Sequence, residues 1–186
     1  MIMRFRLIFV LLSLGVGSAS IVHADEEIVV TFDDAEVGKP LPSWTSMDVV
    51  FEPDGKLSRS KAKPRIMFFP HLKTGKKGVL SAMAAEAIPV RIRFPEGASK
   101  VTLVLWGSIG SAALVEALDQ EGKVVDNASL EQVPNRASPA DPIPSFELTV
   151  KSPRITSVRF GGAYPGGYLA AEEIRFTRSV TGAGKD

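Results

Sequence analysis

The chain has 186 residues, and its 22 basic residues almost balance its 21 acidic ones. This balance argues against the strongly basic surface of a general nucleic-acid-binding protein. The chain contains no cysteine, which excludes disulfides, a thiol nucleophile and a lipid-bearing cysteine. A domain of this length can be held by its own hydrophobic core.

The N-terminus has the plan of a cleavable secretory signal. Arg4 and Arg6 precede an uncharged apolar run from Leu7 to Val16, and Val22-His23-Ala24 has the small-x-small style of a cleavage site. The run is shorter than the ~20 residues that span a bilayer. We therefore expect residues 1–24 to be a signal peptide and the protein to be secreted or periplasmic, although an uncleaved first helix is the alternative. Cleavage leaves 20 basic and 21 acidic residues, a net charge of −1.

Short runs rich in β-branched and aromatic residues recur along the rest of the chain, separated by Gly, Pro, Asp and Asn. This pattern predicts many short strands, and no later run is long enough to span a membrane. The expected strands are Ile28–Phe32, Asp48–Phe51, Ile66–Phe69, Val79–Ala82, Val90–Phe94, Lys100–Trp106, Ala113–Leu118, Phe146–Val150, Ile155–Phe160 and Glu173–Phe176.

Local patterns add detail to these strands. Val90–Phe94 alternates apolar residues with two arginines, which predicts one core face and one solvent face. Val101–Trp106 is apolar on nearly both faces, as in a central strand. Asp119–Gly122 predicts a tight hairpin turn, and Asn127–Ser145, with four prolines, predicts a surface loop. The Ala-rich end of Gly78–Ile88 is compatible with either strand or helix.

These elements predict an all-β protein. We expect one β-sandwich or jelly roll over residues 25–178, mostly antiparallel, followed by a flexible tail over 179–186. Trp106 is expected to be a core residue. The other side chains expected in the core are Ile92, Phe94, Leu103, Leu105, Val158 and Phe160.

Short motifs in both halves of the chain support this fold. The first half carries Thr31-Phe32-Asp33-Asp34, Gly38-Lys39-Pro40, Val50-Phe51, His71–Gly75 with Val79-Leu80, and Val90–Pro95. The second half carries Leu118–Val125, Ile155–Gly162 and Glu172–Phe176. Together they resemble the galactose-binding-like jelly-roll domains of bacterial exported proteins, over nearly the whole chain after the signal.

The resemblance implies carbohydrate binding and a structural calcium ion near the first and last strands. The matching acidic residues are Asp33 or Asp34 early in the chain and Glu172 or Glu173 late in it. Calcium takes several oxygen ligands from carboxylates and backbone carbonyls. This sequence has Glu-Glu where Asp-Asp is commoner in the family, and the alternative is that these are ordinary solvated acids at strand ends.

Most catalytic chemistries have no support in the sequence. Beyond the signal, His71 is the one histidine, and there is no G-x-S-x-G or complete P-loop motif. Asp33 and Asp34 are adjacent, so on a strand they would point to opposite sides rather than at one sugar. The chain is therefore expected not to be an enzyme, and a glycoside hydrolase-like sandwich is the less favoured alternative.

Aromatic residues in loop-like contexts are the candidate ligand-binding residues, because sugar rings stack on aromatic faces. They are Trp44, Tyr164 and Tyr168, the last two within a glycine-rich segment. The alternative is that these rings pack against the ends of the sandwich.

The stretch Lys56–Lys77 is basic and contains no acidic residue. It is either a solvated loop or a patch for anionic glycans, lipopolysaccharide phosphate or an acidic partner. The candidate patch residues are Arg59, Lys61, Lys63, Lys73, Lys76 and Lys77. We therefore expect a non-enzymatic exported binding module for carbohydrate or another envelope component, with a structural or assembly protein of the envelope as the alternative.

Overall fold

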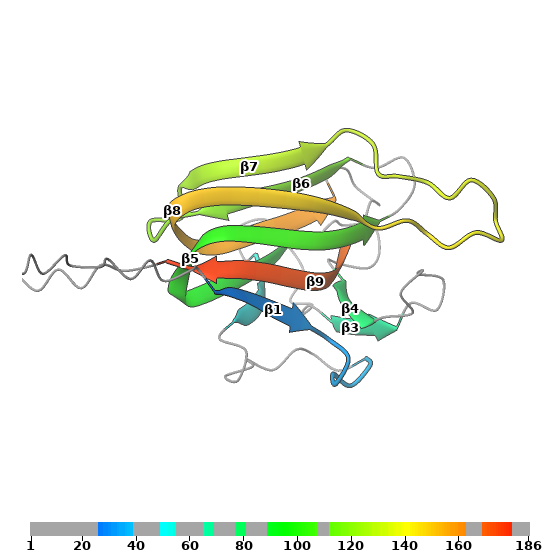
Figure 1. Cartoon of the computed structure of the whole chain (residues 1–186), viewed down its shortest axis with the longest axis horizontal. Coiled ribbons are helices and arrows are strands. Elements are labelled where there is room, and N and C mark those ends of the chain that lie inside the picture. The colour runs from blue at the N-terminus through cyan, green and yellow to red at the C-terminus, as the bar shows by residue number, and fades with distance from the viewer. Residues whose placement is uncertain are drawn as a thin grey trace, which may run out of the picture.

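The computed structural model describes residues 26–38, 49–54, 65–68, 77–80, 89–107, 112–162 and 169–179. Every regular element in these ranges is a strand, and every pairing is antiparallel, which confirms the all-β prediction (Figure 1). The strands are β1 (Glu27–Thr31), β2 (Val50–Pro53), β3 (Arg65–Phe68), β4 (Lys77–Leu80), β5 (Val90–Gly107), β6 (Ala113–Leu118), β7 (Val124–Leu130), β8 (Phe146–Gly162) and β9 (Leu169–Arg178). Over the same ranges, no helix is long and apolar enough to cross a membrane.

Strands β5 and β8 are long and run through both layers of the sandwich. The first half of β5 pairs with the second half of β8, as at Arg93 and Ser157, and the other two halves pair with each other, as at Val101 and Val150. The register shifts between Arg93 and Lys100, where the strands bend. One hydrogen-bonded network of strands thereby folds over on itself, as sandwiches do when strands turn a corner from one sheet to the other.

Each layer is completed by the shorter strands. In one layer, β2 pairs with the first half of β5, while β6 and then β7 extend from the second half of β8. In the other, β9 lies between the second half of β5 on one side and β1 and β4 on the other. Strand β3 pairs with β4 at the outer edge of that layer.

The core lies between the two layers. Phe94 of β5 meets Phe176 of β9 with ring centroids 4.9 Å apart, and Phe32 meets Phe51 edge-on at 5.7 Å, so both pairs join residues of opposite layers. All six side chains predicted to point into the core are buried: Ile92, Phe94, Leu103, Leu105, Val158 and Phe160. Trp106 is buried as well.

The structure joins two pairs of strands that the sequence pattern separates. Val90–Phe94 and Lys100–Trp106 form the single strand β5, and Phe146–Val150 and Ile155–Phe160 form β8. The linking residues include Gly97, with a φ of 76°, and the polar stretch around Pro153. Their composition is typical of a loop because the corner of the sandwich is exposed, although both strands continue through the corner with shifts in register.

The predicted hairpin at 119–122 is confirmed. Gly122 has a φ of 79°, and the Asp119 carboxylate accepts hydrogen bonds from the backbone N–H groups of Glu121 and Lys123. The second strand of this hairpin, β7, extends to Leu130, so the loop predicted from Asn127 starts at residue 131 instead. The second half of this edge strand is mostly polar, because an edge strand needs little apolar surface, so it lacks the apolar alternation that predicts a strand.

One end of the sandwich collects many strand ends, and we call it the loop end; it lies to the right in Figure 1. Pairings place the C-terminal ends of β5 and β8 there, since Gly107 is opposite Leu169 and Gly162 is opposite Ala113. Further pairings bring the ends of β2 and β4 to the same place. The bends of β5 and β8 lie at the other end.

Candidate functional site

The three aromatic candidates, Trp44, Tyr164 and Tyr168, lie outside the described residues. The structure does describe the strand ends that flank two of them. Tyr164 and Tyr168 belong to the segment between Gly162 and Leu169, and both of these flanking residues are at the loop end. The segment therefore leaves and rejoins the sandwich at the loop end.

Five of the six basic candidates also lie outside the described residues: Arg59, Lys61, Lys63, Lys73 and Lys76. The first three belong to the segment between Asp54 and Arg65. Asp54 follows β2, whose Pro53 is opposite Val90, and Arg65 is opposite Leu80, which itself pairs with Ala170. These pairings put both flanking residues at the loop end.

Lys77, the sixth basic candidate, is described and half-buried at the start of β4. Its ammonium donates hydrogen bonds to the carbonyl oxygens of Asp33, at 2.7 Å, and Ala35, at 2.8 Å. The group therefore binds the chain's own turn after β1.

The acidic candidates for calcium lie in different environments. Asp33 and Asp34 are exposed in the turn after β1, and Glu172 is almost fully buried on β9. Glu173 accepts a hydrogen bond of 2.6 Å from Nε of Arg175. Among the described residues, no group of three or more acidic or histidine side chains is placed to hold a metal ion.

A charged cluster that sequence reasoning missed crosses the outer face of the β2–β5–β8–β6–β7 layer. At its centre Asp54 is 2% exposed. Its carboxylate accepts hydrogen bonds from Nη2 of Arg91, at 3.3 Å, and from Nη1 of Arg159, at 2.9 Å. Nε of Arg159 also donates to Glu116 at 2.8 Å. We call Asp54, Arg91, Arg159 and Glu116 the arginine cluster.

Electrostatics hold this cluster together. Arg91 and Arg159 lie directly opposite each other on neighbouring strands, where like charges repel. The buried Asp54 carboxylate between them offsets that repulsion. Burial lowers the pKa of Arg159, but its hydrogen bonds to Asp54 and Glu116 and their negative charges raise the pKa by more. The guanidinium is thus firmly charged and fixed in place.

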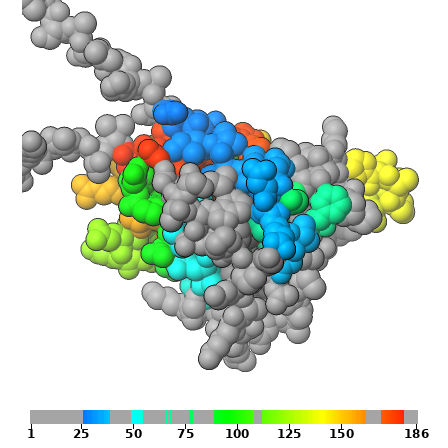
Figure 2. All heavy atoms as spheres, turned by 90° about the horizontal axis from the view of Figure 1, so that it is seen from below, coloured from blue at the N-terminus to red at the C-terminus, as the bar shows by residue number. Residues whose placement is uncertain are grey.

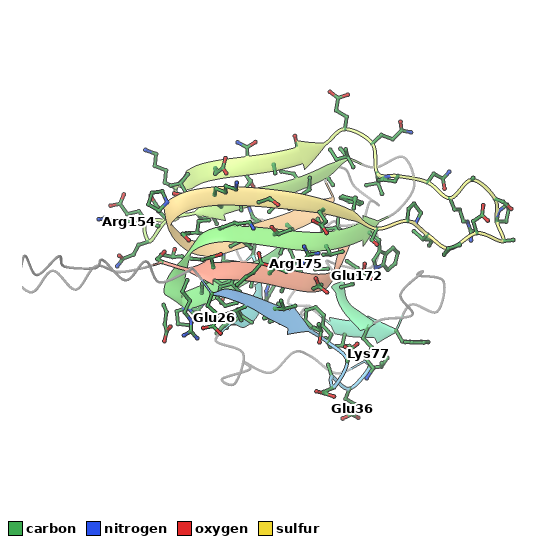
Figure 3. All side chains as sticks on the ribbon, viewed as in Figure 1. Glu26, Glu36, Lys77, Arg154, Glu172 and Arg175 are labelled. Carbon is green, nitrogen blue, oxygen red and sulfur yellow. The ribbon has the colours of Figure 1, made fainter. Side chains whose placement is uncertain are left out.

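The outer face of the other layer carries a second set of paired charges. Arg175 of β9, labelled in Figure 3, donates from Nε to Glu173 at 2.6 Å and from Nη2 to Glu147 of β8 at 2.7 Å. Both hydrogen bonds raise the pKa of Arg175, and the one to Glu173 has the larger effect. Beside them the hydroxyls of Thr102 and Thr149 share a hydrogen bond of 2.9 Å.

These faces are better suited to holding the fold than to catalysis. Asp54 is too deeply buried to meet a molecule in solution, and both of its carboxylate oxygens accept hydrogen bonds from arginines. Within the described ranges, the large aromatic side chain with substantial exposure is Phe68, at 48%. The aromatic candidates Tyr164 and Tyr168 belong to the segment attached at the loop end.

A weak sequence signal points to part of the arginine cluster. Arg91 and Arg159 each alternate with apolar residues on their strands, which predicts that both face outward. Nothing in the sequence singles out Asp54, because its burial depends on the pairing of β2 with β5. Recognising the cluster requires the register in which β2 pairs with β5.

Comparisons with known proteins agree with this architecture. No family model and no curated protein matches the sequence. Among solved structures, the chain is similar to the K1 cleaved adhesin domain of Lys-gingipain from Porphyromonas gingivalis W83, with a TM-score of 0.51 and 10% identity over 82% of this chain and 98% of that domain.

Two further solved structures match with lower TM-scores. TmCBM61, solved in complex with β-1,4-galactotriose, matches at 0.45, with 10% identity over 80% of this chain and 94% of that one. The α-L-arabinofuranosidase MgGH51 matches at 0.48 with 12% identity; 82% of this chain is covered, but only 26% of the enzyme. At these identities the likeness shows the fold alone: this chain and the adhesin domain share a fold, which in this chain is an all-β sandwich.

Proposed function

We propose that this chain is a non-enzymatic exported module that binds carbohydrate or another component of the cell envelope. The observation that carries the proposal is the topology of the loop end. The segment with Tyr164 and Tyr168 and the segment with Arg59, Lys61 and Lys63 both start and finish there.

This juxtaposition would suit a glycan chemically. An aromatic ring stacks on the apolar face of a sugar, and neighbouring cations attract acidic or phosphorylated groups through a field that salt weakens. The adhesin domain that shares this fold is matched over 98% of its length, so the match takes in almost the whole of a domain that is described as an adhesin domain. That likeness supports binding without naming a ligand.

The test is glycan-array binding of the wild-type protein, followed by Tyr164→Ala. We expect Tyr164→Ala to weaken binding by about 1 to 2 kcal/mol, roughly five- to thirtyfold, with a nearly unchanged melting temperature, because a ring that is free to bind a sugar adds little to folding. Phe68→Ala is the matched control. It removes an exposed ring from the residue of β3 that pairs with Lys77, outside the segment that carries Tyr164, and should leave binding intact.

Two outcomes would contradict the proposal. A large fall in melting temperature with binding intact would assign Tyr164 to packing. A wild-type protein that binds no glycan or envelope extract would favour the structural or assembly alternative.

Export is part of the proposal. Residues 1–24 lie outside the described residues, and the support comes from their sequence pattern. N-terminal sequencing of the protein recovered from periplasm or medium should give Asp25 first. An N-terminus at Met1 would favour the uncleaved helix.

A further inference from the structure

The turn after β1, residues 32–38, is attached to the β3–β4 hairpin (Figure 2). Phe32 and Ala35 anchor the turn in the core, and the Ala35 N–H donates to the Phe32 carbonyl at 3.0 Å. Gly38, with a φ of 83°, donates its N–H to the carbonyl of Ile66 on β3 at 2.8 Å. The turn is thereby fixed against β3 at one end.

Lys77 of β4 fixes the middle of the turn. Its ammonium lies 2.7 Å from the Asp33 carbonyl oxygen and 2.8 Å from the Ala35 carbonyl oxygen, so two backbone oxygens converge on one positive charge. In Figure 3, Lys77 lies beside the turn that carries Glu36, with Glu172 nearer the centre of the sandwich. Hydrogen bonds from a charged donor are stronger than neutral ones.

Close packing of β4 on β9 sets the position of Lys77. Its neighbour Gly78 is so near β9 that a Cβ there would lie 2.7 Å from the Ala171 carbonyl oxygen. Glycine at this position lets the two backbones approach. The lysine side chain then extends from β4 to the turn.

The same turn is where the family resemblance implies calcium, and the described residues do not suit that ion. Calcium needs six to eight oxygens, many from carboxylates and carbonyls. Here the carbonyls of Asp33 and Ala35 already accept hydrogen bonds from an ammonium, and Glu173 is bound by Arg175. A divalent cation at these oxygens would also be repelled by the Lys77 charge at short range.

We propose that the Lys77 ammonium takes the place of a structural metal ion in the 32–38 turn, so that this domain folds and stays folded without calcium. A covalently attached cation supplies the positive charge for the converging carbonyls. The stability of the turn then depends on this side chain and not on the ion content of the surroundings. This inference concerns folding and does not depend on the proposed glycan binding.

The experiment is thermal unfolding of the wild-type protein and two variants, each with calcium and with chelator. The wild-type melting temperature should be the same in both conditions. Lys77→Met should lower it by roughly 3 to 8 °C, because the two carbonyls lose their charged donor. Lys100→Met is the control: its ammonium meets Glu27 at 3.1 Å in an exposed pair, and its loss should change little.

Either of two results would overturn the proposal. One is a wild-type melting temperature that rises in calcium or falls in chelator. The other is a Lys77→Met protein with the same melting temperature as the Lys100→Met control. If Lys77→Met does not fold, the wild-type comparison still decides whether calcium is needed, and Lys77→Gln, which keeps a donor for one carbonyl, should show a smaller loss.

Discussion

Asp54 and Glu172 are acidic side chains that the fold buries almost completely. For Asp54 the compensation is visible, since Arg91 and Arg159 both donate to its carboxylate. A buried charge is tolerated only when partners replace its hydration. At the scale of single residues, the stability of this outer face therefore depends on the anion between two cations.

Removing that anion should be costly. Asp54→Asn would leave Arg91 and Arg159 opposite each other with no negative charge between them. We expect a loss of about 2 to 4 kcal/mol in the free energy of unfolding, below the largest values for buried pairs because both arginines keep some exposure. Urea titration measures it.

Glu52→Gln is the matched control for this variant. It breaks the exposed pair of Glu52 with Arg93, whose atoms are 3.2 Å apart, and should cost less than about 1 kcal/mol. Equal losses in the two variants would show that Asp54 is not the centre of the cluster.

Truncation of an apolar side chain should lower the free energy of unfolding most where the side chain is buried in the core. Leu103 of β5 is fully buried between the layers, so Leu103→Ala removes buried methyl groups and leaves a cavity. We expect a loss of about 2 to 5 kcal/mol in the free energy of unfolding, measured by denaturant titration. Val125→Ala on the edge strand β7, where Val125 is 37% exposed, should change it by less than about 0.5 kcal/mol.

At the scale of elements, a few contacts hold the β3–β4 hairpin in position. Among the described residues, strand β4 pairs with β9 at Val79 and Leu80, and the close approach at Gly78 brings the hairpin near enough to hold the turn after β1. Short strands of this kind cannot be stable by themselves. Their position is set by β9 and by the turn.

Gly78→Ala should therefore push β4 away from β9. The added Cβ would be 2.7 Å from a backbone oxygen that cannot rotate aside, and we expect a cost of about 1 to 3 kcal/mol in the free energy of unfolding. Gly161→Ala makes a looser contact, 3.2 Å from Pro89 Cα, and should be tolerated better. The same loss in both variants would mean that β4 does not need this close approach.

For the whole molecule, the decisive feature is that β5 and β8 belong to both layers. Each layer contains one half of β5 and one half of β8, so the unfolding of one layer would disrupt the strands at the centre of the other. The described sandwich should therefore unfold as one cooperative unit.

Calorimetry tests this cooperativity. The calorimetric and van't Hoff enthalpies of unfolding should agree, and far-UV circular dichroism should give the same midpoint as calorimetry. Two resolved transitions would show that the layers unfold separately in spite of their shared strands.

The sequence by itself determined the fold class, the positions of most strands, the hairpin at Asp119–Gly122 and the six predicted core residues, because hydrophobic alternation and turn chemistry are local properties of the chain. The continuity of β5 and β8 and the extent of β7 were decided by tertiary structure, since polar corners and edge strands need partners rather than apolar side chains to stay paired. The burial of Asp54 and the contact of Lys77 with the turn after β1 were decided in the same way. Each joins residues more than 35 positions apart, and such distances become contacts only when the register of the strands is fixed.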